Sequence, residues 1–139
     1  MKLVPSAILY LAGALTLSSC ASTELQTAMS VDDVVEHQEA LIGSVVSVSG
    51  YLRFGDDTRN LWMNRETYEQ ISNGYVSPTD PVWSRCITLY NIGQNRNALL
   101  RRDGKEMIVT GVVQRVTHQA GDIVIGACSD LGLSIQAVR

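Results

Sequence analysis

The sequence predicts a mainly β protein whose five strands form a small barrel with short helices. Several segments alternate apolar and polar side chains, as residues 46–49 (Val-Ser-Val-Ser) do, and a period of two is typical of half-buried strands. Two long segments share one pattern, in which six residues ending in Val-Ser or Val-Thr separate Gly43 from Gly50 and Gly104 from Gly111. A glycine inside a long strand indicates a bend, which a small coiled barrel needs at its corners. An open α+β sheet with the same elements is the alternative.

Capping residues, periodicity and turn residues place the elements in chain order. Ser30 and Asp33 form a capping-box pattern ahead of a short helix that ends at Gly43. Residues 55–57 (Gly-Asp-Asp) join the first two strands into a hairpin, and Asn64 is the expected N-cap of the next helix. We expect strands at 46–54, 59–63, 86–90, 106–116 and 133–138, a short extended piece at 123–125, and further helices at 64–72 and 95–102.

The order of these elements resembles the OB-fold, a five-stranded Greek-key barrel with a helix between its third and fourth strands. The resemblance covers residues 42–139 and includes the glycines inside the first and fourth strands. OB-folds commonly bind ligands over their second and third strands and the loops after the first and fourth, which implies a candidate binding face. Its residues are Tyr51, Arg53, Arg59, Trp62, Arg85 and Tyr90. Alternatively, Trp62 is a core residue beneath the 64–72 helix, and Tyr51 only shields the sheet.

The first 20 residues have the features of a secretory leader. Lys2 supplies a positive charge, and residues 8–17 form an apolar run of ten, too short for a membrane-spanning helix of ~20 residues. The leader ends in Leu17-Ser18-Ser19-Cys20, which resembles the lipobox of bacterial lipoproteins. The resemblance implies cleavage between Ser19 and Cys20, a diacylglyceryl thioether on Cys20, and acylation of the new amino terminus, for example with palmitate.

The lipobox divides the chain into three parts. Residues 1–19 are the expected lipoprotein signal peptide, residues 20–29 the lipidated amino terminus and a polar tether, and residues 30–139 the OB-like barrel domain. Several acyl chains on Cys20 meet the requirement of more than one chain for stable anchoring. The resemblance therefore implies a lipid-anchored protein of the cell envelope. In a Gram-negative cell, Ala21 rather than Asp after the cysteine favours the outer membrane, with the domain facing the periplasm.

Cys86 and Cys128 are the two remaining cysteines. An exported domain matures in an oxidising compartment, where paired cysteines form disulfides. The sequence contains no Cys-x-x-Cys motif, which argues against a redox-active pair. We therefore expect a structural Cys86–Cys128 disulfide between the start of the third strand and the turn before the last strand.

The charge of the chain argues against a polyanionic partner. The 139 residues carry a net charge of −3, and removal of the leader with Lys2 changes this charge to −4. Such a domain lacks the electrostatic footprint of a nucleic-acid-binding protein. We expect a non-catalytic binding or assembly module with an envelope protein or a glycan as its partner. A structural lipoprotein without a specific ligand is the alternative.

No residue pattern in the sequence indicates catalysis. Neither His37 nor His118 has a sequence neighbour that would complete a catalytic triad, and neither Gly-x-Ser-x-Gly nor His-Glu-x-x-His occurs. Asp32–Asp33 and Arg101–Arg102 suit the first and last turns of helices, where their charges complement the helix dipole. We expect no catalytic residue, metal or cofactor, and a small envelope hydrolase is the remaining alternative.

Overall fold

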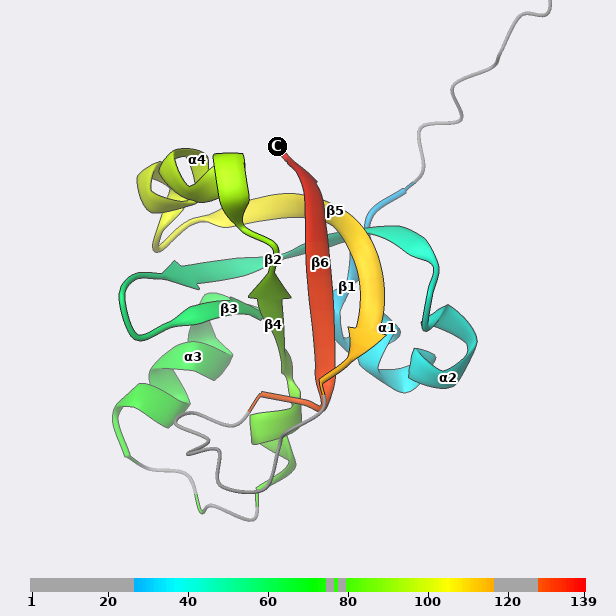
Figure 1. Cartoon of the computed structure of the whole chain (residues 1–139). Coiled ribbons are helices and arrows are strands. Elements are labelled where there is room, and N and C mark those ends of the chain that lie inside the picture. Colours follow the sequence, from blue (N-terminus) through cyan, green and yellow to red (C-terminus); the bar gives the residue numbers. More distant parts are fainter. Residues whose placement is uncertain (1–26, 75–76, 78–79, 117–127) are drawn as a thin grey trace, which may run out of the picture.

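Five strands of the computed structural model form a barrel (Figure 1). The structure describes residues 27–74, 77, 80–116 and 128–139; the expected signal peptide, Cys20, His118 and the extended piece at 123–125 lie outside these residues. The barrel strands are β2 (Val45–Phe54), β3 (Arg59–Trp62), β4 (Cys86–Tyr90), β5 (Glu106–Arg115) and β6 (Leu131–Val138). β6 begins at Leu131, earlier than expected, because Leu131 continues the buried alternation of Leu133 and Ile135.

The strands pair in the order β2-β3-β4-β6-β5, and β5 also pairs with β2, which closes the sheet. β4 and β6 run parallel, whereas the other barrel pairs are antiparallel. A closed five-stranded sheet with one helix between its third and fourth strands matches the OB-fold. The prediction of a mainly β, OB-like barrel is therefore confirmed, and the open α+β sheet is excluded.

A sixth strand, β1 (Met29–Ser30), lies parallel to β2 beside Val48 and Ser49. The Oγ of Ser49 donates a hydrogen bond of 3.2 Å to the carbonyl oxygen of Met29. Met29 also packs against the edge of the barrel core. The last residue of the expected tether is thus part of the sheet, a contact that the polar sequence around it did not predict.

Short helices connect the strands of the described chain. They are α1 (Val31–Glu36), α2 (Gln38–Leu41), α3 (Arg65–Ser72) and α4 (Arg96–Arg102), with 3₁₀ turns at Pro81–Ser84 and Gly93–Asn95. The expected capping box is present, because Ser30 Oγ accepts from Asp33 N at 3.1 Å and Asp33 Oδ2 accepts from Ser30 N at 3.1 Å. These hydrogen bonds from the Ser30 side chain and backbone lower the pKa of Asp33. The expected single helix is divided at His37, whose backbone leaves the helical conformation (φ −101°, ψ 19°).

The core fills the barrel and includes one side of two helices. Val31 and Val34 of α1 and Leu99 of α4 are fully buried, with 0% of each side chain exposed. They pack with the inward-facing residues of the five barrel strands. Burial of apolar surface at about 25 cal/mol per Å² is the main favourable contribution to such a fold. The two helices therefore contribute side chains to the core of the barrel. Helix α4 lies beside the ends of β5 and β6 (Figure 1).

The two strand glycines lie where backbone segments approach closely. A Cβ atom at Gly50 would lie 2.5 Å from the carbonyl oxygen of Trp62. A Cβ atom at Gly111 would overlap the carbonyl group of Ser134. The register of β5 against β6 shifts at Gly111, and such a bulge bends its strand, in agreement with the curved course of β5 in Figure 1.

Candidate functional site

Two aromatic residues of the expected binding face, Tyr51 and Trp62, lie beneath α3. Their exposed fractions are 7% and 5%, and the two residues pair across β2 and β3. The ring centroid of Tyr68 on α3 lies 5.9 Å from that of Tyr51 and 5.6 Å from that of Trp62. The structure therefore supports the alternative interpretation, in which the 64–72 helix covers Trp62 and Tyr51 shields the sheet. Neither ring is accessible to a ligand in this conformation.

Arg53 is held by α3 and by the turn after α4. Its guanidinium lies 4.4 Å from the ring centroid of Tyr68, a cation–π arrangement. Its Nε donates at 3.1 Å to Asp103 Oδ1, which also accepts from the backbone N of Phe54 at 2.8 Å. Arg53 therefore connects three parts of the fold and is already satisfied by protein groups.

Arg59, Arg85 and Tyr90 do not complete an open face. Arg85 donates through Nη2 to Asp32 on α1 at 2.6 Å. Tyr90 is half-buried, with its ring over Gly132, where an added Cβ would lie 2.6 Å from the ring. Arg59 is exposed at the start of β3. The structure thus distributes the expected face over a closed aromatic cluster, two ion-paired arginines and two separate side chains.

The expected Cys86–Cys128 disulfide is present, with the two Cα atoms 5.0 Å apart. It joins the start of β4 to the segment before β6. Ser129 reinforces this junction, because its backbone N and its Oγ both donate to the carbonyl oxygen of Cys86, at 3.1 and 2.6 Å. Cys86 packs with Tyr51 and Trp62 in a cluster separate from the barrel core. The disulfide therefore supports the aromatic cluster beneath α3.

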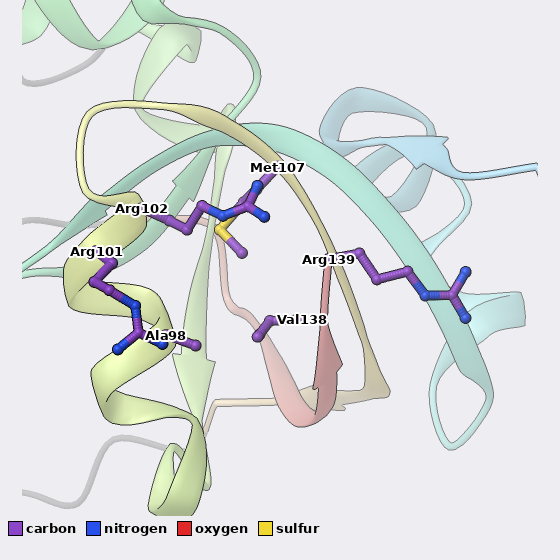
Figure 2. Close-up of a pocket in the computed structure, with 6 residues that line it drawn as sticks. All are labelled: Ala98, Arg101, Arg102, Met107, Val138 and Arg139. Carbon is purple, nitrogen blue, oxygen red and sulfur yellow. The ribbon is translucent and has the colours of Figure 1, made fainter.

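A basic pocket that the sequence did not predict lies between α4 and the adjacent ends of two strands (Figure 2). Its volume is about 180 Å³, and we call it the arginine pocket; it is lined by Ala98, Arg101, Arg102, Met107, Val138 and Arg139. Figure 2 shows Met107 and Val138 facing the space beside α4, with Arg102 reaching over Met107. Arg139 extends from the end of β6 away from α4. The pocket therefore combines apolar side chains with the arginines of α4, while the guanidinium of Arg139 lies farther from α4.

The three arginines of the pocket have no carboxylate partner among the described residues. Other arginines of the described chain do form ion pairs; these are Arg53, Arg65, Arg85, Arg96 and Arg115. Arg101, Arg102 and Arg139 are all exposed, and Lys105, in the turn after α4, adds an exposed cation without an ion pair in this part of the structure. A protein with a net negative charge thus gathers several basic side chains without ion-pair partners at one place.

A wider hollow of about 320 Å³ continues the arginine pocket toward β2. It shares Arg102, Met107 and Arg139 with the pocket and adds Ser49, Glu106 and Ile108. Burial raises the pKa of the Glu106 carboxyl above its ordinary value. Ionised Glu106 opposes an anion in this hollow, and its protonation as the pH falls makes the hollow more positive.

Strand register places Ser30, the last residue of β1, in one row with Arg139 of the arginine pocket. Ser30 lies beside Ser49, Ser49 beside Ile108, and Ile108 exchanges two backbone hydrogen bonds with Arg139, at 2.9 and 3.2 Å. Four strands therefore contribute to one row that ends at Arg139. Three strand spacings of about 4.8 Å separate its ends by ~15 Å along the sheet.

No local feature of the sequence predicts this pocket. Arg101 and Arg102 occupy the last turn of α4 as expected. Their favourable interaction with the helix dipole is enough to explain two arginines at that position, so the sequence does not call for a ligand there. Arg139 is remote in sequence and reaches them only through the pairing of β5 with β6. A pair of adjacent arginines before a tight turn is the single feature that could have drawn attention to this end of the barrel.

The remaining candidates for chemistry form no site in the described ranges. The Nδ1 atom of His37 lies 2.9 Å from the carbonyl oxygen of Asp33, one turn earlier in α1. No group of three or more His, Cys, Asp or Glu side chains is arranged to hold a metal ion in this part of the chain.

None of the helices in the described segments has the length and hydropathy needed to cross a bilayer. No protein-family model and no curated protein matches the chain.

Proposed function

We propose that the protein is a lipid-anchored component of the cell envelope whose OB-like barrel binds an anionic ligand without transforming it. The observation that carries this proposal is the set of unpaired arginines around the arginine pocket. Guanidinium groups bind carboxylates and phosphates through paired, charge-assisted hydrogen bonds. An anionic ligand would supply the partners that the described chain does not.

The lining of the pocket favours binding over catalysis. Its side chains are arginine, alanine, methionine and valine, and none of these is a general base or nucleophile at neutral pH. Glu106 in the adjoining hollow is a single carboxylate. We therefore assign the pocket a recognition role, and an envelope hydrolase would require groups that this site does not contain.

The anchor supports the proposal from the sequence side. Leu17-Ser18-Ser19-Cys20 has the order of a lipobox, and residues 20–28 precede the first strand. Nine residues extend at most ~30 Å, so lipidation of Cys20 would hold the barrel near the bilayer surface. In a Gram-negative cell we assign this surface to the periplasmic side of the outer membrane, because Ala21 follows the cysteine.

Replacement of the anchor residue tests this assignment. The wild-type protein extracted from membranes is expected to begin at Cys20 and to carry a diacylglyceryl group and an additional acyl chain, as measured by intact-mass spectrometry. Cys20→Ala is expected to abolish both lipidation and processing, because the thiol that accepts the lipid is absent. Ser19→Ala is the matched control and is expected to be processed normally. A wild-type protein with an unmodified Cys20 thiol would remove the anchor from the proposal.

A further inference from the structure

We infer that the arginine pocket binds the phosphate group of an anionic phospholipid in the membrane that holds the anchor. This inference rests on the proposed function, in which the barrel is lipid-anchored and binds an anion. It adds the chemical class of the ligand and its source. The charge of the pocket, its apolar side chains and its position relative to the tether support this assignment.

The charges around the pocket suit a phosphate group. Arg101 and Arg102 line the pocket from α4, Arg139 lines it from the end of β6 with its guanidinium directed away from α4, and Lys105 follows in the turn. Asp103 is already occupied by Arg53 and the Phe54 amide. Glu106 is a nearby carboxylate that opposes an anion. Forked guanidinium donors can bind the oxygens of a phosphate ester, for which arginine is the preferred side chain.

The apolar part of the pocket distinguishes a lipid from a free anion. Met107 and Val138 line the pocket beside the arginines of α4, and Leu100, which precedes Arg101 in the chain outside the pocket lining, is 44% exposed. A free phosphate gains nothing from these side chains, whereas the glycerol and the first methylene groups of a phospholipid bury apolar surface against them. Exposed apolar residues among arginines are also typical of surfaces that lie in the headgroup region of a bilayer.

The position of the pocket allows this contact. Ser30, the last residue of β1, and Arg139 belong to one row across the sheet, ~15 Å apart along it. A tether of ~30 Å or less then connects β1 to the bilayer. The anchor therefore keeps the pocket at a high effective concentration relative to the headgroups of the same leaflet.

The test is a titration of the full chain in nonionic detergent micelles, with backbone amide shifts recorded by NMR. The probes are dihexanoyl-phosphatidylglycerol, dihexanoyl-phosphatidylcholine and inorganic phosphate. Phosphatidylglycerol is expected to shift amides of residues 98–108 and 139 in a saturable manner, and more tightly than the other two probes. Arg101→Gln/Arg102→Gln is expected to weaken this binding at least about tenfold, because each lost charge-assisted hydrogen bond contributes that much or more.

Two further variants keep the result interpretable. Arg59→Gln/Arg65→Gln removes the same charge away from the pocket and is expected to bind like wild type; an equal loss would indicate nonspecific attraction and overturn the inference. Glu106→Gln removes the opposing charge and is expected to tighten binding. If phosphatidylcholine bound as tightly as phosphatidylglycerol, the assignment of an anionic phospholipid would be overturned. If inorganic phosphate bound as tightly, the lipid assignment would also be overturned, but the proposal that the pocket binds an anion would stand. Absence of binding by all three probes would overturn both the inference and the anionic ligand of the proposed function.

Discussion

Replacement of Cys86 and Cys128 by alanine is expected to lower the free energy of unfolding by about 4 kcal/mol. The disulfide spans a sequence separation of 42 residues, and a loop of this length loses about 4 kcal/mol of conformational entropy in the unfolded chain when it is closed. A domain of this size has a total stability of about 5–15 kcal/mol. Urea denaturation of the oxidised wild type and of the double variant measures the difference.

The location of the disulfide adds a local consequence. Cys86 packs against the rings of Tyr51 and Trp62, so the double variant is also expected to loosen the cover that α3 provides. Reduction of the wild type by dithiothreitol serves as the control and should reproduce most of the loss without a change of side chain. A loss below about 1 kcal/mol in both experiments would contradict the structural role of the bridge.

The substitution Gly50→Ala is expected to destabilise the barrel by about 1–3 kcal/mol, the usual cost of forcing an extra carbon into a packed site. The added Cβ would lie 2.5 Å from the carbonyl oxygen of Trp62 and 2.9 Å from Cγ of Leu61. The Trp62 oxygen belongs to the backbone of the paired strand β3 and cannot rotate away. Thermal or urea unfolding of the full chain measures the loss.

Gly55→Ala is the matched control for this prediction. Gly55 follows β2 in the hairpin turn, and the nearest atom to an added Cβ there is Cγ2 of Thr58 at 3.9 Å. This is ordinary van der Waals contact, so the change in stability is expected to stay within about 0.5 kcal/mol. If the two alanine variants were equally stable, the close approach of β2 and β3 at Gly50 would not exist in the folded protein.

Local patterns predicted most of the barrel because its strands are encoded by local alternation. The period-two segments around Val48 and Val109 are strands with those residues fully buried. The glycines at 50 and 111 lie at the close approaches that a coiled barrel requires. The cysteine pair also followed from simple chemistry, since the export expected from the sequence would place the two cysteines in an oxidising compartment, where they favour a bridge.

The candidate site could not be predicted in the same way because it depends on tertiary contacts. Whether Tyr51 is a contact residue or a covered one depends on the packing of α3 over β2 and β3, which alternation alone does not specify. The arginine pocket requires the register that brings Arg139 beside Ile108 and β5. Met29 was expected in a tether and joins the sheet through a backbone pairing that any side chain permits.

Photo-crosslinking in intact cells tests most directly whether the anchored barrel binds a ligand through the arginine pocket. Asn97 is exposed and lies one turn before Arg101 on α4, so a photoreactive residue there reaches the pocket without filling it. Gln70, exposed on α3 away from α4 (Figure 1), is the control position. The account predicts a crosslinked anionic envelope component at position 97, identified by mass spectrometry and lost in Arg101→Gln/Arg102→Gln. No adduct above that at position 70, or an adduct unaffected by the arginine substitutions, would contradict it.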